Sequence, residues 1–143
     1  MKQDCNVLVL CTGNSCRSQM AEGYLRHFAN NKANIFSAGL EKHGVNPRAI
    51  ACMLEDGINI SKHTSNHIEE YAHIAGDFVL TVCNHADEHC PVFFSSAKRV
   101  HQNFQDPSKT IGTEKEVSAH FAKVREEIKA FCKDFIAENL DNS

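Results

Sequence analysis

The sequence predicts an α/β fold of three layers, a four-stranded parallel sheet flanked by helices, and three observations indicate it. Short apolar runs alternate along the chain with segments of helical periodicity, as in strands joined by crossover helices. The clearest periodicity lies near the C-terminus, where apolar residues recur at alternating steps of four and three. The length of 143 residues leaves room for one core, so we expect residues 1–143 to form a single domain.

Four short runs rich in β-branched and aromatic residues are the expected strands. They are Asn6–Leu10, Ile35–Ser37, Phe78–Val82 and Val100–Phe104. Helices are expected from Ser18 onward, from Pro47 to about Glu55, over roughly Asn66–Ala75 and along the C-terminal stripe. The stripe consists of Val117, Phe121, Val124, Ile128, Phe131 and Phe135.

Three residues with reactive side chains each follow an expected strand closely. They are Cys11, Cys83 and Asp106. Because the sites of parallel α/β sheets lie at the carboxyl ends of their strands, we expect these three side chains to share one site.

Composition and charge exclude several classes of function. The net charge is −3 and the basic residues are scattered, so the basic face of a nucleic-acid-binding protein is missing. The apolar run Val7–Leu10 is too short for a secretion signal or a membrane span. We therefore expect a cytoplasmic protein that binds neither nucleic acid nor membrane.

Cysteine is unusually frequent, with 7 residues among 143. The count is odd and nothing else indicates secretion, so a structural disulfide framework is not expected. In a reducing compartment such cysteines pack in the core, bind metal or carry out redox chemistry. Cys5, Cys52 and Cys132 are best interpreted as packing residues.

The segment from Cys11 to Ser18 joins an expected strand to an expected helix, where backbone N–H groups converge and the helix N-terminus adds positive charge. A tetrahedral oxyanion fits such a loop, and Arg17 can clamp it through two hydrogen bonds. The expected oxyanion-binding residues are Thr12, Gly13, Asn14, Ser15, Cys16 and Arg17. We expect the same field to lower the pKa of Cys11 from its usual value of about 8.5, and Ser18 to donate a hydrogen bond to the sulfur.

Two other interpretations of this loop stay open. One is a glycine-containing turn with a buried cysteine, which is common after a strand. The other is a nucleotide-binding loop, although the Gly-Lys-Ser/Thr ending of that motif is absent. The spacing Cys-x5-Arg-Ser between a strand and a helix favours the anion site with a thiolate nucleophile.

The run CTGNSCRSQMAEG, which begins at Cys11, resembles the signature of the low-molecular-weight protein tyrosine phosphatase superfamily, in its thioredoxin-coupled arsenate reductase branch. Also similar to that branch, in the same order, are SAGLEKHGVNPRAI, His63–Ser65, the pair Cys83 and Cys90, and Asp106-Pro107. The resemblance implies a low-molecular-weight phosphatase-like, flavodoxin-like fold. It also implies reduction of arsenate to arsenite, with phosphate as a competitor, no cofactor and no metal ion, and we expect a monomer.

The resemblance assigns roles to individual residues. Cys11 is the nucleophile, assisted by Arg17 and Ser18, and Asp106 is the general acid that protonates the departing oxygen. Cys83 and Cys90 are relay cysteines, which form first a Cys11–Cys83 disulfide and then a Cys83–Cys90 disulfide that thioredoxin reduces. Positions expected to order the loop are Asn14, Glu22, Ser37 and His63, while Asn66 replaces an aspartate of potassium-binding relatives.

Two rival functions stay open at this point. A low-molecular-weight phosphatase uses the same loop but needs only one cysteine. The aromatic residues that commonly follow its Asp-Pro pair are replaced here by Ser108 and Lys109, which favours a small inorganic substrate. The other rival is a non-enzymatic metal or redox sensor, in which Cys83 and Cys90 act with His85 and His89.

Overall fold

The computed structural model describes residues 5–91 and 96–140. Its sheet has four parallel strands in the order β2-β1-β3-β4. The strands are β1 (Asn6–Cys11), β2 (Asn34–Gly39), β3 (Phe78–Thr81) and β4 (Lys98–His101). This order confirms the predicted parallel sheet and is that of a doubly wound fold, in which the chain passes from β1 to β2 on one side and later to β3 on the other.

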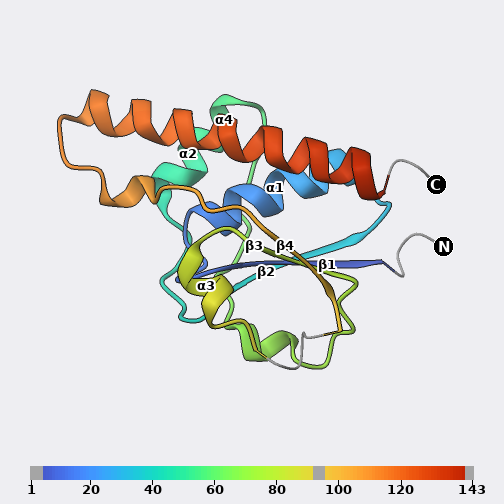
Figure 1. The fold of residues 1–143 in the computed structure, drawn as a ribbon. Helices are drawn as coiled ribbons and strands as arrows, with labels where there is room; N and C mark the ends of the chain where they lie inside the picture. The colour runs from blue at the N-terminus through green and yellow to red at the C-terminus, as the bar shows by residue number, and fades with distance from the viewer. Residues whose placement is uncertain (1–4, 92–95, 141–143) are drawn as a thin grey trace.

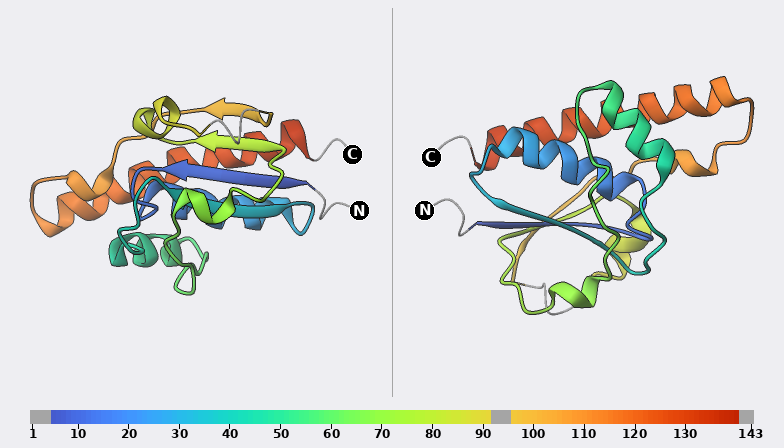
Figure 2. Two further views of the ribbon diagram at one scale, coloured as in Figure 1. Left: turned by 90° about the horizontal axis from the view of Figure 1, so that it is seen from below. Right: turned by 180° about the vertical axis from the view of Figure 1, so that it is seen from behind.

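Helices cover both faces of the sheet, which gives the three predicted layers (Figure 1). On one face lie α1 (Arg17–Ala29), α2 (Pro47–Glu55) and α4 (Glu114–Asn139). Figure 2 shows that the opposite face carries the short α3 (Asn84–Glu88) and the 3-10 turn η2 (Ile68–Tyr71). That residues 1–143 form a single domain stays a prediction.

The core is built around β1, which is paired on both sides and covered on both faces. All of its residues from Val7 to Cys11 are therefore buried. Ring contacts fix the two outer layers to the sheet. Phe78 of β3 meets Phe135 of α4 with ring centroids 5.1 Å apart, and Phe36 of β2 meets Tyr71 of η2 at 5.2 Å.

The predicted C-terminal stripe faces the core along α4. Its buried members are Phe121, Val124, Ile128 and Phe135, while Val117 and Phe131 are partly buried. The helix begins with a reciprocal cap, because the Thr113 hydroxyl accepts from the Glu116 N–H and the Glu116 carboxylate accepts from the Thr113 N–H. Among the helices of the described ranges, α4 included, none combines the length and the apolar character needed to cross a membrane.

Two of the predicted elements differ in the structure. The helix expected over Asn66–Ala75 is wrong, because only one 3-10 turn forms there; the backbone of His67 is instead bridged to Gly39 beside β2. The fourth strand ends at His101 rather than Phe104. Beyond it the Phe104 N–H still donates to the Val82 carbonyl at 3.1 Å, so the chain continues beside β3 outside regular strand pairing.

Candidate active site

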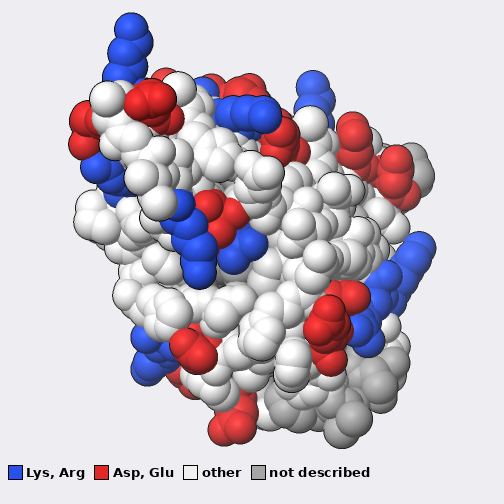
Figure 3. Space-filling model, turned by 60° about the vertical axis from the view of Figure 1, so that its left-hand side comes forward, with Lys and Arg blue, Asp and Glu red and all other residues white. Residues whose placement is uncertain are grey.

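The site lies between the carboxyl ends of β1 and β3, at the point where the order of the strands changes direction across the sheet. Cys11 ends β1, and a cavity of about 270 Å³ opens in front of it. The cavity is lined by Cys11, Thr12, Gly13, Ser15, Cys16, Arg17, His43, Asp106, Ser108 and Lys109. Figure 3 shows this end of the molecule, where basic and acidic side chains are interspersed. The structure thus brings the predicted anion loop and Asp106 together.

On the outer side of the anion loop (residues 11–17), backbone carbonyl groups of the loop accept hydrogen bonds. The segment that follows β2 donates backbone N–H groups to them: Leu40 to Cys11, Glu41 to Thr12, His43 to Gly13 and Asn46 to Ser15, at 2.9–3.3 Å. This directs successive carbonyls away from the cavity and leaves the intervening amides for an anion. Gly39 permits the close approach, since a Cβ there would lie 2.7 Å from the Thr12 carbonyl oxygen.

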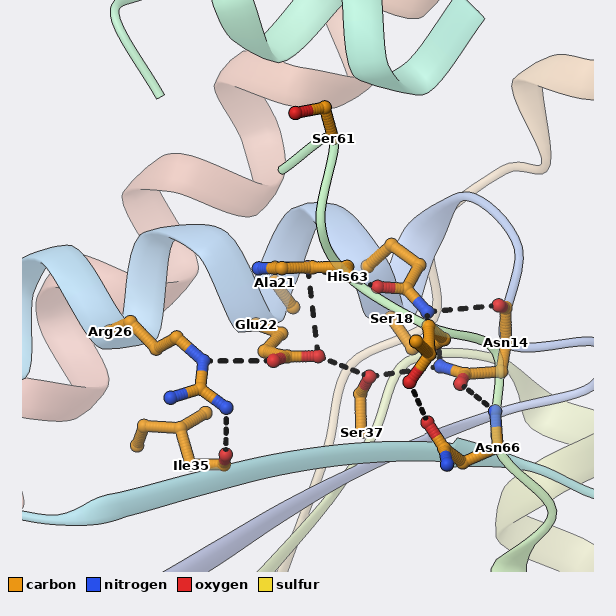
Figure 4. A network of polar contacts seen from close by, with 12 residues as sticks. Asn14, Ser18, Ala21, Glu22, Arg26, Ile35, Ser37, Ser61, His63 and Asn66 are labelled. Carbon is orange, nitrogen blue, oxygen red and sulfur yellow. Dashed lines mark hydrogen bonds and ion pairs between the residues drawn. The ribbon is translucent and has the colours of Figure 1, made fainter. Parts of the chain in front are cut away.

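Asn14 fixes the shape of the loop from inside the protein (Figure 4). It adopts a left-handed conformation with φ of 50° and is fully buried. Its side-chain NH2 donates to the hydroxyls of Ser18 at 2.8 Å and Ser37 at 3.0 Å, and its oxygen accepts from the Asn66 N–H at 2.7 Å. The predicted ordering role of Asn14 is thereby explained. A hydrogen bond from Ser18 to the Cys11 sulfur stays a prediction.

The network continues from the loop into α1. The Ser37 hydroxyl donates to Glu22 Oε1 at 2.6 Å, and Arg26 Nε donates to Glu22 Oε2 at 2.8 Å. His63 lies 3.7 Å from the same carboxylate. Sequence reasoning missed Arg26, whose spacing of four residues from Glu22 on a helix was the available signal. Its guanidinium supplies the positive charge beside Glu22.

Arg17 and Asp106 meet across the cavity. Arg17 Nη1 donates to the Phe104 carbonyl at 2.9 Å, and its Nη2 lies 3.7 Å from Asp106 Oδ2. Asp106 Oδ1 accepts from both the N–H and the hydroxyl of Ser108, at 3.0 and 2.6 Å. The Oδ2 atom is therefore the one directed toward Arg17. A carboxyl group that acts on an oxyanion bound by Arg17 needs this orientation.

Cys83 lies beside Cys11 and changes its ionisation. The Cys83 sulfur lies 3.4 Å from the Thr12 hydroxyl and accepts from the Ala86 N–H at 3.4 Å. A hydrogen bond from Cys11 is the main cause that lowers the pKa of Cys83 to about 5, with further help from these two donors. The same bond, together with burial, raises the pKa of Cys11. The predicted lowering at Cys11 is therefore not found, because the contact with Cys83 and the burial of the thiol both raise its pKa.

Comparison with known proteins decides the relationship of the chain. The model of the low molecular weight phosphotyrosine protein phosphatase family matches residues 6–143. The chain belongs to this family. An arsenate reductase of Halalkalibacterium halodurans is 46% identical over 129 residues, which is 90% of this chain and 93% of that protein. An arsenate reductase of Bacillus subtilis is 44% identical over 129 residues, again 90% of this chain and 93% of that protein.

Solved structures agree with this membership. An arsenate reductase in the phosphate binding state matches with a TM-score of 0.79 at 35% identity, covering 94% of this chain and 98% of the other. A tyrosine phosphatase of Erwinia amylovora has the same TM-score at 20% identity, covering 96% and 93%, and shows the shared fold. Within the family, the relatives and structures at higher identity are thus arsenate reductases, as the sequence motifs predicted.

Cys90, the third cysteine of the predicted relay, lies on the far side of α3. Cys83 caps the start of α3 and is buried, whereas Cys90 follows its end and is half-buried. Burial raises the pKa of Cys90 above that of an ordinary thiol. The structure thus brings Cys83 to Cys11 directly and keeps Cys90 one short helix away.

The two histidines near α3 do not form a metal site with Cys83 and Cys90. The rings of His85 and His89 pack in a tilted arrangement with centroids 4.4 Å apart, and His89 Nδ1 donates to the His85 carbonyl at 2.9 Å. Within residues 5–91 and 96–140, no group of three or more Cys, His, Asp or Glu side chains is placed to hold a metal ion. The metal-sensor interpretation therefore has no support from the geometry of these residues.

The structure adds one histidine that the sequence did not single out. His43 lines the cavity, and its Nδ1 lies so close to Gly13 that a Cβ on that glycine would be 2.3 Å away. Its Nε2 is bonded to Glu41 at 2.6 Å. No local pattern indicates this position, because His43 reaches the loop only after the chain has crossed from β1 to β2.

Proposed function

We propose that this protein reduces arsenate to arsenite in the cytoplasm, with electrons from its own cysteines. The observation that carries the proposal is the pair formed by Cys11, at the base of an oxyanion cavity, and Cys83, whose pKa is lowered by its contact with Cys11. Hydrolysis of a phosphate ester needs only the first of these. A second thiolate beside the nucleophile is what a two-electron reduction requires.

In the first displacement the Cys11 sulfur attacks arsenate, which Arg17 and the loop amides hold in place. Cys11 passes its proton to the Cys83 thiolate as it attacks, since these two groups already share that proton. Asp106 gives a proton to the departing oxygen, which leaves as water. A sulfur–arsenic bond forms, and arsenic is still in its oxidised state.

Cys83 then releases the proton that it took from Cys11 to solvent and, again as a thiolate, attacks the sulfur of Cys11 in the second displacement. The sulfur–arsenic bond breaks and its electron pair stays on arsenic, which leaves as arsenite. The two electrons come from the sulfurs of Cys11 and Cys83, which are now joined as a disulfide. Cys90 then attacks Cys83, so that Cys11 leaves as a thiolate and the disulfide becomes Cys83–Cys90.

The third displacement requires α3 to unwind. Cys83 and Cys90 flank α3 and are seven positions apart, and a continuous helix over that span would rise about 10.5 Å at ~1.5 Å per residue. A disulfide needs Cα atoms within about 7 Å. Unwinding also exposes the new disulfide, and we propose that thioredoxin reduces it there. Phosphate competes for the same cavity, and the protein works as a monomer.

Arsenite production with thioredoxin, thioredoxin reductase and NADPH tests the proposal. Cys83→Ser and Cys90→Ser should each stop multiple turnovers, whereas Cys5→Ser, outside the site, should keep the wild-type rate. Both relay variants should retain weak hydrolysis of an aryl phosphate, which needs only the loop and Asp106, and Cys11→Ser should lose both activities. Steady reduction by either relay variant would show that the relay is wrongly assigned.

A further inference from the structure

The loop that carries Asp106 is tied at both ends to one side chain of α4, that of His120. His120 Nε2 lies 3.0 Å from Gln105 Oε1, and its Nδ1 is hydrogen-bonded to the Thr110 hydroxyl. Gln105 precedes Asp106 directly, and Thr110 ends the turn η4 (Pro107–Lys109) that Asp106 caps. One imidazole therefore bridges the two points at which the chain enters and leaves the general-acid segment.

The donors and acceptors of Gln105, His120 and Thr110 match one another in this bridge. The Gln105 oxygen can only accept, so Nε2 of a neutral imidazole must carry the proton and donate it. Nδ1 then accepts from the Thr110 hydroxyl, and both ring nitrogens are satisfied. The rigid ring thus directs one nitrogen to Gln105 and the other to Thr110.

The bridged segment also sets the position of Arg17. Phe104 directly precedes it, packs against Phe131 of α4 with ring centroids 5.7 Å apart, and offers the carbonyl that binds Arg17 Nη1. The α4 helix thus holds the segment through an apolar contact before Asp106 and through His120 on both sides of it. Arg17 and Asp106, which both line the cavity in front of Cys11, depend on this anchoring.

We propose that His120 is a positioning residue for the general acid Asp106. The inference deepens the proposed function and rests on it, because a general acid at Asp106 has a role only if the loop binds a reacting oxyanion. Proton transfer by a positioned acid contributes about 10²–10⁴-fold to a rate. A displacement of about 1 Å can remove about 10²-fold of such an effect, so a ring that fixes both ends of the segment matters to the chemistry.

Hydrogen exchange tests the positional part without relying on any activity. In His120→Ala, amides of residues 105–110 should exchange at least about tenfold faster, since the two bonds that tie the segment are gone. Amides of α4 beyond Phe121 should stay as protected as in wild type. Lys123→Ala, an exposed change one turn further along α4, is the matched control and should alter neither region. Unchanged exchange over 105–110 in His120→Ala would overturn the proposal.

Leaving-group dependence tests the catalytic part. With phenyl phosphate, whose poor leaving group needs the acid, His120→Ala should lower kcat by about tenfold, and with p-nitrophenyl phosphate by only about two- to threefold. The inhibition constant of phosphate should stay within about twofold, because the anion loop is untouched. In an Asp106→Asn background the His120 change should have no further effect. An equal loss with both esters would leave His120 a purely structural residue and overturn the assignment.

Failure of the proposed function and failure of the positioning role of His120 give different results. If the wild-type protein yields no arsenite with thioredoxin, the proposed function fails, whatever His120 does to exchange over residues 105–110. If arsenite is produced and His120→Ala leaves both the exchange and the ester ratio unchanged, the positioning role alone fails. Gln105→Ala and Thr110→Val remove one bond each, and each should reproduce part of the His120→Ala exchange effect.

Discussion

Two segments at the same edge of the sheet hold the two halves of the proposed chemistry, and they are built in opposite ways. The anion loop is fixed by backbone bonds on its outer side and by the fully buried Asn14 within. The α3 helix (Asn84–Glu88) has five residues, of which only Ala86 is buried. Several of its polar contacts lie at the surface, such as the one from Arg99 to the Asp87 carbonyl at 2.6 Å.

The difference follows from what each segment must do. An anion site needs amides that stay in place when charge develops, and buried hydrogen bonds are expensive to break at about 1–3 kcal/mol each. A relay must instead allow the Cys83 sulfur to exchange Cys11 for Cys90 as its disulfide partner. Exposed ion pairs contribute about 0–1 kcal/mol, so a segment held by them opens at little cost. The molecule thus places a rigid site beside a segment that is inexpensive to unfold.

The thiol contact between the two segments gives the largest expected effect. The thiolate absorbance of the reduced protein should show a step with a midpoint near pH 5, which disappears in Cys83→Ser. Below that midpoint Cys83 is protonated, and above it the thiolate persists. In Cys11→Ala the main stabilising hydrogen bond is lost, so the midpoint should rise toward that of an ordinary cysteine thiol. An unchanged midpoint in Cys11→Ala would show that the two segments do not share a proton.

The rigidity of the loop is tested next, through Asn14→Ala. The change leaves the Asn66 N–H without its buried partner and removes the donor to Ser18 and Ser37. We expect the free energy of unfolding to fall by about 3 kcal/mol in urea denaturation. Asn30→Ala is the control, because Asn30 also has a left-handed backbone with φ of 48° but is exposed. Equal losses in both variants would assign the effect to backbone strain alone.

The lability of α3 is tested by hydrogen exchange on oxidation. Amides of residues 84–90 should lose protection when the Cys83–Cys90 disulfide forms, because a helix cannot close that bond. Amides of the anion loop and of α4 should keep theirs. Equal protection of residues 84–90 in both redox states would mean that the pair closes without unwinding, and the contrast between the two segments would disappear.

The smallest effect is expected for a single surface contact of α3. Arg99→Ala removes the bonds to the carbonyl and the carboxylate of Asp87. Each is exposed, so the rate of Cys83–Cys90 disulfide formation in a single turnover should rise only about two- to fivefold. Lys98→Ala, on the preceding exposed position of β4, should leave the rate unchanged. A slower reaction in Arg99→Ala would show that this contact guides the closure rather than restrains α3.

Much of this architecture could be predicted from local pattern. The periodic stripe from Val117 to Phe135 predicted α4, and the Cys-x5-Arg-Ser spacing predicted the loop at the end of β1. The segment over Asn66–Ala75 was predicted wrongly as a helix, since the backbone at its start is bonded to distant partners: the Asn66 carbonyl accepts from the Gly39 N–H and the Asn66 N–H donates to Asn14. Local propensity is a weak guide where distant partners satisfy the backbone.

The sequence by itself determined which residues we expect to carry the chemistry, because a thiol and an arginine at a fixed spacing between a strand and a helix are encoded by neighbours along the chain. Only the tertiary structure decided where the charge lies and what holds each group. Cys11 and Cys83 are far apart in sequence, and so are Asp106 and His120. The pKa of a buried thiol depends on donors and charges within a few ångströms, and no local pattern states which distant residues those will be.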